Sequence, residues 1–450
     1  MKRRGFMPNI RTYASMMSGY ATVDDWGPLT KQLKFADSVY GQLKQHLQDS
    51  RNVINDPTGE TDASLILYPI ALYISTLGKA GKYQKAFDVF HQLDTDGPLA
   101  PHPKVYSSLL CVLADRVDSS DAEVMAQTVS DAKYVWRRHM RSLDRQPDHY
   151  IESRSVEAII QVLSRGEASD HELMFDILRN ICGLPHSRHT AGEDDENRRL
   201  SPPPPPPPPP SPPKVEPNRW ILREVLDSCT AAGRPDMAVY YAQSVMDTPK
   251  LRPILRAWHL HKLLRAHLLL AEEGSTSPAR SESVAAWVEW MVEQAGQDTS
   301  RAPNKHTLTS ALELCYRCED VGSALRIARV MLEGPMQGSM PTKAWAHLLR
   351  LAIVASPNDK WRCLELLNRY DSVLDVWESG SAVERLGSQE KRAHVSLALC
   401  VVQVLRNAAP PSLDPDGVEE VDTAELDRYK AWSDLRRRAE SFLKMARADS

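Results

Sequence analysis

The chain has 450 residues, which is enough for two or three ordinary domains or for one long array of repeats. Its 42% hydrophobic and 25% charged residues are ordinary for a globular protein. The formal net charge of −4 excludes a protein that attracts nucleic acid through an overall positive charge, so any such binding needs a locally basic surface.

The cysteines and the apolar runs bear on the compartment. The seven cysteines are scattered and odd in number, which favours a reducing environment over a disulfide scaffold. The uncharged apolar run 393–405 is shorter than the roughly 20 residues that a membrane-spanning helix needs, so we expect no membrane span. No signal peptide or organellar presequence is visible, and because a repeat already begins at Pro8, we expect a truncated start.

Residues 303–334 indicate two short amphipathic helices joined by a tight turn. The inward-facing positions, three and four residues apart, are Leu308, Leu312 and Cys315 in the first helix and Ala324, Ile327, Val330 and Met331 in the second. Pro303 precedes the first helix, and Gly334 with Pro335 ends the second. A hairpin this small cannot bury its apolar face alone, so neighbouring copies must stack.

Copies of this unit recur along the chain. Segments similar to the start of its first helix begin at Pro8, Pro103, Pro217 and Pro341. We expect four helical pairs before residue 185, of which the last two cover 104–143 and 153–182. In the second-helix half, Gly81 precedes Ala86 and Gly233 precedes Ala238 by the same distance. The glycine permits the turn and the small alanine lets two helices approach closely.

These residues resemble the pentatricopeptide-repeat family, whose unit has a tyrosine in its first helix and a Lys-Ala-Gly turn before an alanine-centred second helix. The closest matches are Thr12-Tyr13, Lys79-Ala80-Gly81 and Ala86. The resemblance implies an all-α fold, a right-handed α-solenoid of helix-turn-helix repeats, and an organellar RNA-binding protein in the mitochondrion. Tetratricopeptide repeats have a similar period, so a protein-binding solenoid is the alternative.

Changes in composition divide the chain into four parts. We expect N-terminal repeats over 1–184, a disordered Pro-rich linker over 185–217, a second repeat block over 218–378 and C-terminal capping helices over 379–450. Pro202 to Pro210 is unbroken proline, which adopts an extended polyproline II conformation. It is either a spacer or a ligand for an SH3-type or WW-type domain.

No motif in the sequence predicts catalysis or a cofactor. The nucleotide-binding, zinc-protease and nucleophile-elbow signatures are absent. Cys315 and Cys318 form a single CxxC inside a predicted helix and are expected to be core residues. His259, His261 and His267 lack a cysteine or carboxylate cluster, so we expect them on a solvated helix face. We therefore predict a non-enzymatic protein without a cofactor.

The resemblance implies that each repeat reads about one base through two or three side chains. It places one set of base-contacting positions just after the first-helix aromatic, at Ala14, Ser107, Thr309 and Ala346. It places a second set just after the loop proline, at Asn9, Asn218 and Asn304. Threonine and asparagine can hydrogen-bond a base edge and alanine cannot, so only part of a readout is present. The asparagines can equally cap helices.

The densest basic segment with an aromatic residue is 136–141, with Trp136, Arg137, Arg138 and Arg141, followed by Arg145. It can follow phosphates and stack a base, or it can be a solvated helix face. The sequence thus predicts single-stranded RNA binding in mitochondrial RNA processing, stability or translation. A scaffold for protein partners, including a subunit of the mitochondrial ribosome, is the alternative.

Overall fold

The computed structural model describes residues 8–49, 63–95, 99–117, 121–146, 148–184, 214–296, 298–333, 340–369, 374–378, 387–407 and 423–448. These residues form helices and no strand, which confirms the predicted all-α class over the part of the chain described. The uninterrupted prolines 202–210 and the helix end expected at Gly334 and Pro335 lie outside the described residues. The structure divides into two compact units, Met1–Leu251 and Arg252–Ser450.

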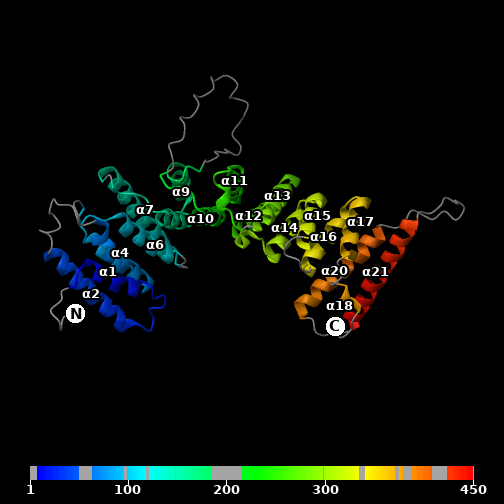
Figure 1. Ribbon diagram of the computed structural model, residues 1–450, viewed down its shortest axis with the longest axis horizontal. Helices are drawn as coiled ribbons and strands as arrows, with labels where there is room; N and C mark the ends of the chain where they lie inside the picture. The colour runs from blue at the N-terminus through cyan, green and yellow to red at the C-terminus, as the bar shows by residue number, and fades with distance from the viewer. Residues whose placement is uncertain are drawn as a thin grey trace, which may run out of the picture. The chain divides into compact units, whose positions relative to one another are not determined.

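The first unit is a series of antiparallel helical pairs (Figure 1). Its helices are α1 Ile10–Ala21, α2 Thr30–Asp49, α4 Ala63–Lys79, α5 Tyr83–His91, α6 Pro103–Arg116, α7 Ala122–Arg145, α8 Ser153–Leu163, α9 Ala168–Asn180, α10 Arg219–Ala231 and α11 Pro235–Asp247. The first helices of successive pairs pack side by side, α1 on α4, α4 on α6, α6 on α8 and α8 on α10. Serial packing of this kind is the repeat stacking that the sequence predicts.

The second unit continues the same construction. Its α-helices are α12 Ala257–Glu272, α13 Pro278–Ala295, α14 Lys305–Arg317, α15 Val321–Glu333, α16 Thr342–Val354, α17 Pro357–Arg369, α18 Asp375–Glu378, α20 Ser388–Asn407 and α21 Thr423–Ala448. Helix α12 packs on α14, α14 on α16 and α16 on α20, while α21 packs on α20. Between α17 and α21, the rings of Trp361 and Trp432 stack with their centroids 3.6 Å apart. The two C-terminal helices therefore cover the last apolar face of this unit.

Local chemistry sets where the helices begin and turn. The side chains of Asn9, Asn218 and Asn304 accept hydrogen bonds from the free amides of the first turns of α1, α10 and α14. Gly81 and Gly233 both have φ near +68°, a left-handed conformation that favours glycine. The caps and turn glycines expected from the sequence are thus confirmed.

The buried faces agree with the predicted periodicity, with local exceptions. Among the inward positions predicted for 303–334, Val330 is only partly buried and the others are buried. Phe35 lies four residues before Val39 but is exposed, because the buried face of α2 runs through Ala36, Val39 and Leu43. Pro69 lies inside α4, which begins at Ala63.

Candidate nucleic-acid interface

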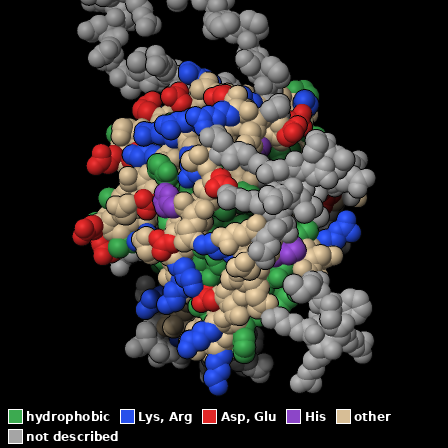
Figure 2. Space-filling view, turned by 90° about the vertical axis from the view of Figure 1, so that its left-hand side faces the viewer, with side chains coloured by type: hydrophobic (Ala, Val, Ile, Leu, Met, Phe, Trp, Pro, Cys, Tyr) green, Lys and Arg blue, Asp and Glu red, His purple; other side chains and the backbone are tan. Residues whose placement is uncertain are grey.

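Helix α7 carries a row of basic side chains along one face. Lys133, Arg137, Arg141 and Arg145 follow one another at intervals of four residues, which places them on the same side of a helix. Arg138 lies beside this row. In Figure 2, Lys and Arg side chains gather near the top of the face displayed, on the side where α7 lies in Figure 1.

The row lines a groove of about 610 Å³, which we call the α7 groove. Its other wall comes from the segment before α6 and from the region after α7, and its lining includes Thr95, Ala100, Pro101, Tyr106, Tyr134, Ser142, Gln146 and His149. Tyr134 is 47% exposed, so its ring is accessible from solvent. The groove therefore combines a basic wall with one accessible aromatic ring.

Packing beneath α7 fixes the direction of the basic row. Val135, Trp136 and His139 are buried on the opposite side of the helix. The His139 ring stacks on Tyr106 of α6, with centroids 4.6 Å apart. The guanidinium of Arg138 lies 4.6 Å from the centre of the Phe90 ring of α5. Trp136 was expected to be the aromatic partner of the arginines in binding, but it is buried, and Tyr134 is the aromatic that faces the groove.

Two of the arginines that line the groove, Arg137 and Arg141, are exposed and are not ion-paired with a carboxylate of the described residues. Lys133 is ion-paired, because its ammonium lies 2.7 Å from Oδ1 of Asp170 in α9. Burial lowers the pKa of His139 to about 4 and also lowers the pKa of His149, so neither ring adds charge at neutral pH.

The predicted base-contacting positions on the first helices are mostly covered. Ser107, Thr309 and Ala346 are buried between helices, and Ala14 is partly buried. The Thr309 hydroxyl donates to the carbonyl oxygen of Lys305 at 2.8 Å. In Asn9, Asn218 and Asn304, the side-chain oxygen is already used for helix capping. None of these residues is among those that line the α7 groove.

The first helices of the first unit also carry a half-buried carboxylate. Burial raises the pKa of Glu224 in α10 to about 7, and the neighbouring carboxylates of Asp227 and Glu157 act in the same direction. The Ser228 hydroxyl donates to Glu224 at 3.3 Å and Arg223 is nearby, and both effects oppose the rise in pKa. Glu224 is therefore largely protonated in the folded chain at mildly acidic pH.

This pKa predicts a pH dependence of stability. Because folding raises the pKa of a carboxyl group, its contribution to stability is present at low pH and is lost as pH rises from about 4.5 to about 7. We expect Glu224→Gln to raise the free energy of unfolding by about 1–3 kcal/mol at pH 8 and to have little effect near pH 4.5. Urea unfolding at both pH values measures this difference. Exposed Glu273→Gln is the matched control, and an equal pH dependence of wild type and Glu224→Gln would contradict the prediction.

Most of the cysteines and histidines that were considered as metal ligands belong to the packed core or cap a helix. Cys315 and Cys318 are buried core residues, as predicted. His259 and His267 were expected on a solvated face with His261 but are buried, since α12 packs against α13 and α14, and only His261 is partly exposed. Nδ1 of His259 accepts a hydrogen bond from the Arg256 amide at 2.9 Å, which caps α12. Among the described residues, no group of three or more His, Cys, Asp or Glu side chains can hold a metal ion.

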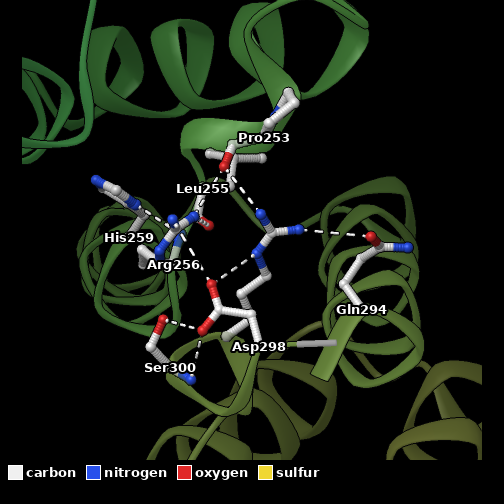
Figure 3. Close-up of polar contacts among 8 residues, drawn as sticks. Pro253, Leu255, Arg256, His259, Gln294, Asp298 and Ser300 are labelled. Atoms are coloured by element: carbon white, nitrogen blue, oxygen red, sulfur yellow. Dashed lines mark hydrogen bonds and ion pairs between the residues drawn. The ribbon is translucent and has the colours of Figure 1, made fainter. Parts of the chain in front are cut away.

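A polar cluster near the start of α12 is likewise structural (Figure 3). Asp298 lies 3.7 Å from the guanidinium of Arg256 and 3.5 Å from that of Arg301. It also accepts the Ser300 amide at 3.0 Å, and these contacts lower the pKa of its carboxyl group, with the Ser300 hydrogen bonds as the main cause. Both arginines donate to the Pro253 carbonyl oxygen. The cluster thus ties together the two irregular segments that precede α12 and α14.

Comparisons with known proteins give a distant likeness. No sequence family and no curated protein matches the chain. Among solved structures, the chain is similar to the pentatricopeptide repeat protein PPR10 from maize at 14% identity, with a TM-score of 0.36, over 98% of this chain and 56% of that one. The complex of PPR10 with an 18-nt psaJ RNA element gives 14% identity and a TM-score of 0.37, over 97% and 57%. The chain thus spans little more than half the length of these proteins.

A tandem-repeat structure also resembles the chain. It is described as a circular tandem repeat protein with novel repeat topology and enhanced subunit contact surfaces. The identity is 10% and the TM-score 0.24, over 97% of this chain and 96% of that one. None of the described helices combines the length and apolar character that a membrane span requires.

Proposed function

We propose that this chain is a non-catalytic helical-repeat protein that binds single-stranded RNA in the α7 groove. The observation that carries the proposal is the pair Arg137 and Arg141, two exposed guanidiniums without a described acidic partner, in a groove that also exposes Tyr134. Arginines bind phosphates through charge-assisted hydrogen bonds, and a tyrosine ring can stack on any base.

The spacing of the row suits a flexible strand. Residues four apart on a helix are separated by about 6 Å along its axis, given a rise of 1.5 Å per residue. A single strand can adjust its backbone to such a row and can turn an unstacked base towards Tyr134, whereas a duplex holds its bases inside. Binding should therefore depend strongly on salt and only weakly on base identity.

The cellular role follows from the family resemblance and not from the groove. Proteins of the pentatricopeptide-repeat type are mostly organellar, so we propose a role in mitochondrial RNA processing, stability or translation. A protein-interaction scaffold, including a ribosome-associated subunit, is the second candidate, and it is favoured by the exposed apolar side chains Tyr316, Val354 and Leu399, which line one groove of the second unit.

Charge reversal at the groove tests the proposal. We expect Arg137→Glu with Arg141→Glu to weaken binding of a labelled 20-nucleotide single-stranded RNA by about tenfold or more at moderate salt. Because each phosphate contact on a single strand contributes about 0.7 to the slope of log affinity against log salt, the slope should fall by about 1.4. Fluorescence anisotropy at several salt concentrations measures both quantities.

The control for this experiment carries the same change in net charge elsewhere. Arg179 in α9 and Arg329 in α15 are exposed residues of other second helices, so Arg179→Glu with Arg329→Glu should leave both affinity and slope nearly unchanged. Equal weakening by the two double variants would show that only overall charge matters, and the α7 groove would then not be the RNA site.

A further inference from the structure

A second groove lies in the second unit, where three successive first helices lie side by side. It has a volume of about 600 Å³ and is lined from the ends of α14 and α16 and from the middle of α20. Large apolar side chains are exposed in it, with Tyr316 at 37%, Val354 at 67% and Leu399 at 47%. We call it the α14–α20 groove. Exposed apolar side chains gathered in one hollow are typical of a protein-interaction surface.

The charges of the groove are divided between its two sides. On the α20 side, the guanidinium of Arg350 donates to the Ser396 hydroxyl at 2.8 Å and forms no ion pair with a described carboxylate. On the α14 side, the exposed carboxylate of Glu319 also forms no ion pair within the described chain. Arg317 adds little charge, since it lies 3.2 Å from Glu272 and 3.0 Å from Glu313.

The dimensions fit one short helix laid across the three. Packed helices lie about 8–10 Å apart, so the distance from the first to the third is about 16–20 Å. A helix of about 11–13 residues covers that length at 1.5 Å per residue. Apolar residues on one face of that helix, at positions i, i+4, i+7 and i+11, span about 16 Å and would meet Tyr316, Val354 and Leu399.

We propose that the α14–α20 groove binds an amphipathic helix of a partner protein, with an acidic residue of that helix against Arg350 and a basic residue against Glu319. The unpaired charges of the groove sum to zero and half of its lining residues are apolar, which suits an amphipathic protein helix. RNA binding depends on phosphate neutralisation, and these side chains provide little of it. The groove is in a different unit from the α7 groove, so this interaction is independent of the RNA proposal.

Selection from a displayed library tests the proposal. The library consists of 16-residue peptides that are randomised at every position among helix-favouring residues, and the target is the full-length chain. The negative target is the variant Val354→Asp with Leu399→Asp. Both residues are exposed, so we expect this variant to fold, which circular dichroism checks. We expect peptides enriched at least tenfold on the wild-type chain, with apolar residues at helical spacing and an acidic residue towards one end.

Charge exchange then assigns the orientation of the peptide. Arg350→Glu should weaken the best peptide about tenfold, and replacing the acidic residue of that peptide by lysine should restore binding to this variant. No enrichment over the Val354→Asp and Leu399→Asp variant, or enrichment without helical spacing, would overturn the proposal. So would an oligouridine strand that displaces the peptide and loses affinity for the same variant, because the groove would then belong to RNA.

Discussion

Replacing Trp345 by alanine is expected to lower the free energy of unfolding of the second unit by about 3–5 kcal/mol. Trp345 is fully buried in α16, and this helix packs against α14, α17 and α20. The alanine variant removes a large apolar side chain and leaves a cavity that these helices can fill only partly, so both the transfer free energy and the packing are lost.

Hydrogen exchange can localise this effect within the chain. Because the second unit has its own core, we expect the amides of α14, α16 and α20 to exchange faster in Trp345→Ala, while those of α4 and α6 in the first unit keep their wild-type rates. Trp220→Ala is the control, since Trp220 is exposed in α10 and its loss should cost about 1 kcal/mol or less. Similar losses for both variants would contradict the described packing.

Gly78→Ala is expected to destabilise the first unit by about 1–3 kcal/mol, although alanine is the better helix former. Gly78 lies in α4 where this helix crosses α6, and a Cβ added there would lie 2.2 Å from Cγ2 of Val112. Non-bonded carbon atoms cannot come this close, so the two helices would have to move apart. Urea unfolding of the full chain measures the loss.

Two further variants separate this contact from the effect of glycine itself. In Gly78→Ala with Val112→Ala, the clashing methyl group is absent, so the double variant should lose at least about 1 kcal/mol less than the sum of the two single variants. Gly41 in α2 has no atom within 4 Å of an added Cβ, so Gly41→Ala should be neutral or stabilising by up to about 1 kcal/mol. If Gly78→Ala changed the free energy of unfolding no more than Gly41→Ala does, this would contradict the close packing of α4 on α6 at Gly78.

The repeated hairpins could be predicted from the sequence because their signals are local. Proline or asparagine before a helix, glycine at the turn and apolar residues at spacings of three and four act within a few residues of each other. Asn218, Gly233 and Ala238 illustrate this, since a cap, a turn and a buried small residue were all expected from one short segment. The hand of the superhelix and the division into four parts stay predictions.

The exceptions occur where tertiary contacts decide. The histidines of α12 were expected on a solvated face, yet packing against α13 and α14 buries His259 and His267. Phe35 is exposed because α2 turns a neighbouring face, which contains Ala36, towards its partners. Neither outcome can be predicted from the periodicity of a single helix. The same spacing of apolar residues is compatible with two orientations of the helix about its axis, which bury neighbouring sets of residues.

The candidate site was predicted only in part. Arg137, Arg138 and Arg141 were recognised from their density, but the aromatic partner was taken to be Trp136 and not Tyr134. The four-residue interval from Lys133 to Arg145 is the sequence signal that could have identified the solvent-facing row of α7. The opposite wall of the groove, with Thr95, Ala100 and Pro101, is distant in sequence and has no such signal.

The most direct test is to crosslink the full-length chain to a 20-nucleotide single-stranded RNA containing 4-thiouridine and to map the crosslinked peptides by mass spectrometry. If the α7 groove binds RNA, the crosslinks will fall within residues 130–149, and they will be lost in Arg137→Glu with Arg141→Glu but not in Arg179→Glu with Arg329→Glu. Crosslinks confined to other helices, or none above a mock control at moderate salt, would contradict it.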